Sequence, residues 1–193
     1  MSHRDADGYL VRRLWPADRV AVEAHFRRLD RETRFSRFMG TVSEAGVQAY
    51  GAGALARDGV VYGAFVDGVL RGIGELRPME SGGLGTEAEA AFTVERPYRR
   101  RGLGTALATR LRGAARHAGV ARVHLRALAS NRALLGLAGK LDADLRLGGY
   151  EAHAVIPVAP PTPLSLWSDA VRGLFDLALA ALGTRPRRIS AGV

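Results

Sequence analysis

The chain has 193 residues, of which 47% are hydrophobic, with a net charge of +9 and no cysteine. This composition excludes a disordered chain, and the length suits one domain with a substantial core and a short additional segment. The absence of cysteine excludes disulfides, zinc–thiolate sites and an acyl-enzyme formed on cysteine.

The first half of the chain predicts two helices and four strands. The strands are expected at residues 9–13, 60–66, 69–76 and 87–94, and the helices at about 16–29 and 43–54. The pair Asp67-Gly68 separates two of these strands and is typical of a tight hairpin turn. Ser43 or Thr41 is expected to cap the second helix, because a hydroxyl accepts from the free amides of a helix start.

The second half predicts a helix, a strand, a helix and a final strand pair, followed by a separate segment. The helices are expected at about 102–117 and 131–141, with strands at 120–127 and on either side of Gly148-Gly149. Four prolines between 157 and 163 then mark a break. Beyond them, apolar residues at three- and four-residue steps from Trp167 to Leu182 predict an amphipathic helix. We expect one domain over 1–158, and over 159–193 a linker, this helix and a basic tail. The helix would dock on its own domain or form a homodimer.

The most informative segment is the turn between the strand at 87–94 and the helix that follows it. Main-chain amides at a helix start have no internal partners, and Gly102 and Gly104 allow an anion to approach them closely. The turn is not a P-loop, because the only lysine of the chain is Lys140. It is not a dinucleotide fingerprint either, because Leu107 stands where the third glycine is needed.

The positive charge of the chain is concentrated around this turn. Residues 96–126 contain nine arginines and no acidic residue. Such a field attracts a ligand with several phosphates, and it could also attract nucleic acid. We expect no nucleic acid partner, because the chain shows neither a helix-turn-helix pattern nor interleaved surface aromatics.

The pattern Arg99-x-x-Gly102-x-Gly104 between a strand and a helix resembles the acetyl-CoA-binding motif of the GNAT superfamily of N-acetyltransferases. Asn131-Arg132-Ala133 resembles the opening of a later helix in that superfamily, and the resemblance covers about residues 8–158. It implies an α+β fold in α/β/α layers, with a mixed, mostly antiparallel twisted sheet flanked by helices. The segment 29–39 and the pair Ala88-Glu89 resemble the bacterial protein-lysine acetyltransferases that act on acetyl-CoA synthetase.

The resemblance implies acetyl-CoA as cofactor and an amine as acceptor. Because an ammonium must lose a proton before it attacks, a carboxylate on the strand leading to the turn is expected to act as base. Glu89 is the first candidate and Glu87 the second, with Glu75 more distant and His124 a further alternative. The expected cofactor contacts are Phe92, Thr93, Val94, Arg99, Arg100, Arg101, Gly102, Leu103, Gly104, Thr105 and Asn131. No metal site is expected, because the histidines lack ligand spacing.

One departure of the chain from many members of the superfamily concerns the source of a proton. They place a tyrosine in the helix after Asn131 to protonate the leaving thiolate, whereas this chain has Leu137-Ala138 at that turn. The proton would then come from water or another group. We expect a cytoplasmic N-acetyltransferase that uses direct transfer and slightly favours protein lysine, since neither a signal peptide nor a membrane span is evident. The alternatives are a small-molecule amine acetyltransferase and a non-catalytic acyl-CoA-binding regulatory module.

Overall fold

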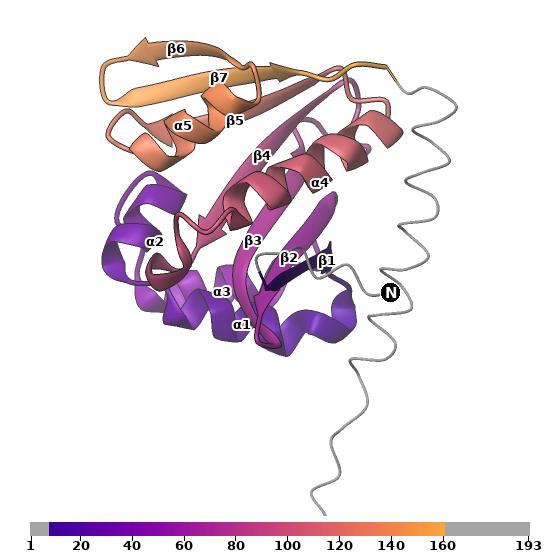
Figure 1. The fold of residues 1–193 in the computed structure, drawn as a ribbon. Helices are drawn as coiled ribbons and strands as arrows, with labels where there is room; N and C mark the ends of the chain where they lie inside the picture. The colour runs from indigo at the N-terminus through magenta and orange to yellow at the C-terminus, as the bar shows by residue number, and fades with distance from the viewer. Residues whose placement is uncertain (1–7, 161–193) are drawn as a thin grey trace, which may run out of the picture.

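The structure is a computed structural model that describes residues 8–160. These residues form a seven-stranded sheet with helices on both faces (Figure 1). The strands are β1 (Tyr9–Arg13), β2 (Val60–Val66), β3 (Val69–Pro78), β4 (Glu87–Val94), β5 (Arg122–Leu128), β6 (Asp144–Gly148) and β7 (Glu151–Pro157). The helices are α1 (Arg19–Arg28), α2 (Arg31–Phe38), α3 (Glu44–Gly53), α4 (Leu103–His117) and α5 (Arg132–Lys140), with short 3-10 helices at Pro16–Asp18 and Arg96–Tyr98.

The sheet has the strand order β1-β2-β3-β4-β5-β7-β6. Among these described strands, β4 and β5 run parallel and the other neighbouring pairs are antiparallel. The expected class, a mixed and mostly antiparallel sheet flanked by helices, is therefore confirmed. The hairpin between β2 and β3 is also confirmed, because Asp67 (φ 51°) and Gly68 (φ 75°) both adopt the left-handed region that such a tight turn requires.

Two hydrophobic layers hold the helices against the sheet. Helices α4 and α5 pack on one face, where Leu111 and Leu137 join Leu125 of β5 in one cluster. Helices α1 and α3 pack on the other face, where Phe26 and Val47 are buried in a second cluster with β2 and β3. Figure 1 shows α4 lying across one side of the sheet and α1, α2 and α3 on the opposite side.

Helix α4 follows its expected bounds and fixes the position of the glycine turn. Leu103, Leu107, Leu111 and Ala115 recur at four-residue steps and are all buried. This stripe seats α4 along β2, β3 and β4, so the helix begins beside the end of β4 from which the chain has just come. The turn is thus held between two rigid elements.

The sequence prediction missed one helix. Residues 31–38, for which no element was expected, form α2, so three helices rather than two precede β2. Asp30 caps α2 by accepting a hydrogen bond of 2.9 Å from the N–H of Thr33. The helix is short and rich in charge, and Thr33 is its one fully buried residue, so its apolar pattern is too weak to reveal a helix from sequence.

The predicted C-terminal helix and basic tail lie outside the described residues. Among residues 8–160, no helix combines the length and the apolar character that crossing a membrane requires.

Candidate functional site

The turn that leads into α4 presents a row of main-chain amides. Arg100 (φ 61°) and Gly102 (φ 81°) adopt the left-handed region, which bends the chain into the helix. Within residues 8–160, no side chain caps α4, and the N–H groups of residues 101–105 donate to no protein acceptor. Free amides and the positive end of the helix dipole together favour an anion at this position.

The two glycines of the turn serve different purposes. A Cβ atom on Gly102 would lie 3.1 Å from Oη of Tyr9, and its backbone conformation also disfavours a side chain. A Cβ atom on Gly104 would meet no atom within 4 Å. Gly102 is therefore required by the fold, whereas Gly104 keeps space open beside the amides.

The three arginines before the turn differ in their surroundings. Arg99 points toward α2 and β4: its Nη2 donates to Oγ1 of Thr33 at 2.6 Å and its Nε donates to the carbonyl of Val94 at 3.2 Å. Arg100 is exposed, and the guanidinium of Arg101 lies 5.3 Å from the ring centre of Tyr98. Arg99 thus ties the turn to the end of β4, while Arg100 and Arg101 contribute charge at the surface.

Strands β4 and β5 separate halfway along β4. Their parallel pairing ends at Ala90 and Leu125. The N–H of Glu95 donates to β3, so the regular alternation of an antiparallel ladder directs the N–H groups of Phe92 and Val94 the other way, toward β5. Because pairing has already ended there, these two amides face a gap between the strands.

The side chain of Thr93 points away from this gap, toward α1. Its Oγ1 lies 3.0 Å from Nε2 of the fully buried His25, whose Nδ1 lies 3.2 Å from Oε1 of Glu95. Burial lowers the pKa of His25, so the neutral ring donates to the Glu95 carboxylate and accepts from the Thr93 hydroxyl. This buried chain of hydrogen bonds fixes the backbone on either side of Val94.

The two carboxylates expected on β4 lie on the same face but have different partners. Glu89 is exposed and lies opposite Arg77 of β3 and His124 of β5. Glu87 forms a short ion pair with Arg122, and His124 contacts its other oxygen at 3.0 Å. The hydrogen bond from Arg122 lowers the pKa of Glu87, which weakens its carboxylate as a base.

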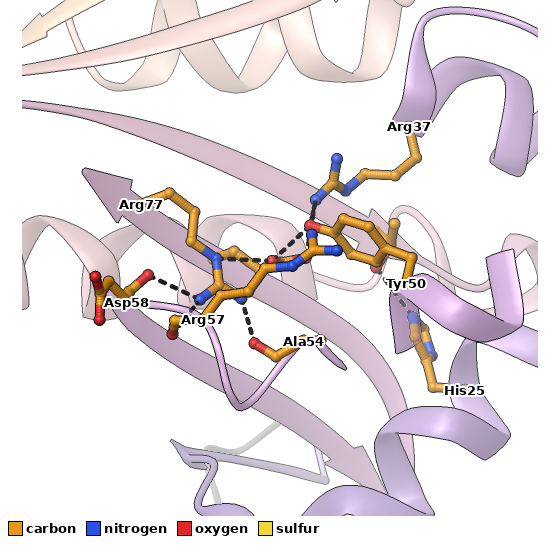
Figure 2. A network of polar contacts seen from close by, with 9 residues as sticks. His25, Arg37, Tyr50, Ala54, Arg57, Asp58 and Arg77 are labelled. Carbon is orange, nitrogen blue, oxygen red and sulfur yellow. Dashed lines mark hydrogen bonds and ion pairs between the residues drawn. The ribbon is translucent and has the colours of Figure 1, made fainter. Parts of the chain in front are cut away.

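Glu75, the more distant candidate, is buried. It belongs to a polar network whose members Arg37, Tyr50 and Arg77 are labelled in Figure 2. Arg37 of α2, Tyr50 of α3 and Arg77 of β3 all bind its carboxylate, at 2.9, 2.8 and 2.7 Å. Burial raises the pKa of Glu75, but the positive charges of Arg37 and Arg77 outweigh this and lower it below the ordinary value. The carboxylate of Glu75 is buried, and its charge is compensated by two arginines. It is therefore poorly placed to take a proton from a substrate.

Arg77 also binds the loop between α3 and β2, next to this network. Its Nη atoms donate to the carbonyls of Ala54, Arg57 and Asp58, as the dashed lines in Figure 2 show. The network therefore joins α2, α3, β3 and the segment before β2.

Helix α5 offers a cap rather than a proton donor. Asn131 Oδ1 accepts from the N–H of Leu134 at 3.1 Å, which places Asn131 at the start of the helix. Leu137 and Ala138 are buried in the core, and α5 contains no tyrosine. A small cavity of ≈10 Å³ lies between α4 and the sheet. Its lining residues are Ala90, Phe92, Ala108, Leu111, Arg112, Val123, Leu141 and Ile156.

Some residues around the site were not found from sequence. His25, Arg37 and Tyr50 build the buried networks behind β3 and β4, and His153 contacts His124. In the sequence, only the family resemblance of segment 29–39 drew attention to Arg37. Among residues 8–160, no group of three or more histidine, aspartate or glutamate side chains is arranged to hold a metal ion.

A comparison with family models identifies the family of the chain. The family model described as the acetyltransferase (GNAT) family matches residues 20–142. A search of curated proteins finds no significant match.

Solved structures share the fold at low sequence identity. The GNAT domain of PAT from S. lividans is 19% identical with a TM-score of 0.64, covering 76% of this chain and 89% of that one. The putative acetyltransferase yncA from Salmonella typhimurium, solved with acetyl-CoA, is 18% identical with a TM-score of 0.60, covering 80% and 96%. The paia N-acetyltransferase from Thermoplasma acidophilum, in complex with coenzyme A, is 17% identical with a TM-score of 0.59, covering 77% and 98%. With the family model matching more than half of its residues, the chain belongs to the GNAT family of acetyltransferases.

Proposed function

We propose that this protein transfers the acetyl group of acetyl-CoA directly to a primary amine. The observation that carries the proposal is the row of amides at residues 101–105, which meet no acceptor among the described residues and lie beside the gap where β4 and β5 separate. Acetyl-CoA supplies the acetyl group as a thioester. Direct transfer follows from the absence of cysteine, since the chain has no thiol to carry the group.

The residues of the turn would hold the diphosphate of the cofactor. The amides of Arg101, Gly102, Leu103, Gly104 and Thr105 donate to phosphate oxygens, and the exposed arginines add attraction over a longer range. The main role of Arg99 would be to hold the turn against β4, and not to contact phosphate. Asn131 lies at the start of α5 and would contact the arm of the cofactor.

The gap would hold the reacting atoms. The N–H groups of Phe92 and Val94 donate to the thioester carbonyl oxygen and stabilise the charge that develops on it. Thr93 contributes its backbone position, since its side chain is bound to His25. Glu89 removes the proton of the acceptor ammonium, because it is exposed and, unlike Glu87 and Glu75, has no arginine bound to its carboxylate among the described residues.

For the acceptor, we propose protein lysine ahead of a small amine. Glu89 lies on an exposed part of the sheet face, which suits a large acceptor, and the segment 29–39 resembles the protein-lysine acetyltransferases. The missing tyrosine in α5 favours a second candidate, a non-catalytic module that binds acyl-CoA. This candidate requires binding without turnover.

Two measurements on the full chain test the proposal. Acetyl-CoA is expected to raise the unfolding temperature, and mass spectrometry is expected to detect acetylated lysine in peptides more readily than acetylated polyamines or aminoglycosides. Binding without any acetylated product would favour the non-catalytic module. No stabilisation at millimolar acetyl-CoA would remove both candidates.

A further inference from the structure

Three side chains form a hydrogen-bonded line across β4, β5 and β7. Nε2 of His124 lies 3.0 Å from Oε2 of Glu87, and Nδ1 of His124 lies 3.0 Å from Nε2 of His153. The two imidazole rings are nearly parallel, with centroids 5.2 Å apart and planes 11° from parallel. We call His124 and His153 the imidazole pair.

The chemistry of these groups fixes the direction of the hydrogen bonds. The carboxylate of Glu87 only accepts, so His124 carries its proton on Nε2 and presents a lone pair on Nδ1. His153 then donates from Nε2 to that lone pair. The neutral pair is left with one basic atom, Nδ1 of His153, which has no partner within residues 8–160. A proton added there gives the pair a positive charge that is spread over both rings through the Nε2–H···Nδ1 hydrogen bond, and the Glu87 carboxylate balances that charge.

The imidazole pair lies beside the proposed base. His124 is directly opposite Glu89 in the parallel ladder, one residue before the last paired position. His153 is opposite Arg126, the residue that follows that last position in β5. Directly paired residues point to the same face of a sheet, so the imidazole pair and Glu89 lie on the same face. Glu89 is on β4 and the imidazole pair is on β5 and β7, next to the position where β4 and β5 separate.

The reaction must dispose of a proton in every turnover. When an ammonium becomes an amide, a carbon–nitrogen bond forms, the carbon–sulfur bond of the thioester breaks, and nitrogen loses two protons. One proton neutralises the leaving thiolate and the other must reach solvent. Glu89 can repeat its role only after it has given its proton away.

We propose that the imidazole pair, held by Glu87, takes up the proton that Glu89 removes from the acceptor amine and passes it to solvent. This inference rests on the proposed function. Imidazole suits the task because it both binds and releases a proton readily near neutral pH. The pair acts through Glu89 and need not touch either substrate.

Charged groups on every neighbouring element set the field around the pair. They are Glu87 and Glu89 on β4, Arg122 and Arg126 on β5, Asp144 and Arg146 on β6, Glu151 on β7, and Arg31, Glu32, Arg34 and Arg37 on α2, which packs over β4 and β5. Most are paired locally: Arg122 with Glu87, Arg126 with Glu151 and Arg146 with Asp144. Arg37 is bound to Glu75, and Glu32 to Arg96. The carboxylate of Glu87 is the charge in direct contact with His124.

The test uses three variants of the full chain: His124→Gln, His153→Ala and, as a control, Arg126→Gln. Arg126 lies on the same strand and face, is exposed, and takes no part in the line of hydrogen bonds. We expect His124→Gln and His153→Ala to lower kcat about tenfold or more with little change in KM, and to alter the acid side of the pH profile of kcat. Added imidazole should restore activity to His153→Ala in proportion to its concentration. Arg126→Gln should keep wild-type kcat and show no response to imidazole.

A second readout does not depend on turnover. Nitrogen NMR of the wild-type protein is expected to find His124 protonated on Nε2, with a ring-nitrogen signal of His124 that changes in His153→Ala. Wild-type kcat and an unchanged pH profile in both histidine variants would overturn the inference while leaving the proposed function intact. A wild-type protein that acetylates no amine would remove the proposed function, and this inference with it.

Discussion

The carboxylate of Glu75 lies 2.9 Å from Nη2 of Arg37, an ion pair that joins the middle of β3 to α2 beneath the surface of the protein. The exposed fraction of the Glu75 side chain is 1% and that of Arg37 is 13%. Because Arg77 and Tyr50 complete the partners of Glu75, the charge is compensated inside the fold. The segment 29–39 therefore supplies a structural arginine at Arg37.

Replacing Glu75 should destabilise the protein strongly. In Glu75→Gln two buried guanidinium groups lose their counter-charge, and breaking a buried ion pair in this way costs about 3–5 kcal/mol. The free energy of unfolding from urea denaturation measures the effect. Glu23→Gln, which removes an exposed pair with Arg19, is the matched control and should change stability by less than about 0.5 kcal/mol. Equal losses in the two variants would contradict the assigned role of Glu75.

The stability of the protein in acid should depend on the same carboxylate. Burial raises the pKa of Glu75, but Arg37 and Arg77 lower it further, so in the folded state it lies below the ordinary value of 4.5. Between these two values the unfolded chain binds more protons than the folded one. The contribution of Glu75 to the free energy of unfolding is thus complete above pH 4.5 and is lost as pH falls through the folded-state pKa. Urea unfolding from about pH 6 to about pH 3 should show a shallower decline in Glu75→Gln than in the wild type. Parallel declines would rule out this source of acid sensitivity.

The two glycines of the turn should respond differently to substitution. Gly104→Val places a branched side chain in open space beside the amides, so we expect acetyl-CoA binding to weaken tenfold or more, about 1.4 kcal/mol, with little loss of stability. Gly102→Ala forces a side chain into a left-handed conformation near Tyr9 and should lower stability by about 1 kcal/mol or more even without ligand. Thermal unfolding with and without acetyl-CoA separates the two effects.

Gly53→Ala is the control for this comparison. It lies at the end of α3, where a Cβ atom meets nothing within 4 Å, and should leave cofactor binding unchanged. Undiminished stabilisation of Gly104→Val by acetyl-CoA would place the diphosphate elsewhere.

Glu89→Gln should abolish most of the turnover without affecting cofactor binding. Removing a general base lowers kcat by about 10²–10⁴, because the acceptor then reacts only through its small neutral fraction. Glu87→Gln should lose less, since the carboxylate of Glu87 is already bound by Arg122 and His124. Release of coenzyme A, measured with a saturating amine, compares the two variants. A larger loss of kcat in Glu87→Gln than in Glu89→Gln would assign the role of general base to Glu87.

Local signals were enough to predict most of the elements. The pair Asp67-Gly68 predicted the hairpin between β2 and β3, and the stripe of apolar residues beginning at Leu103 predicted α4 after the glycine turn. Each signal acts through backbone preference or the spacing of apolar residues within one element, so it can be read without knowing the partner. Helix α2 escaped prediction because few of its residues are buried and its charged side chains bind residues far away in the chain.

The sequence by itself determined the order of the elements other than α2, and the turn at residues 101–105, because both depend on neighbours along the chain. Only the tertiary structure decided which carboxylate stays exposed. Glu75 and Glu89 both lie in strands that alternate, yet Arg37, Tyr50 and Arg77 enclose Glu75, and Glu89 faces outward. Likewise, His124 and His153 meet because β7 inserts between β5 and β6. Strand pairing and ion pairing over such separations follow from the packing of the whole sheet, and no local preference encodes them.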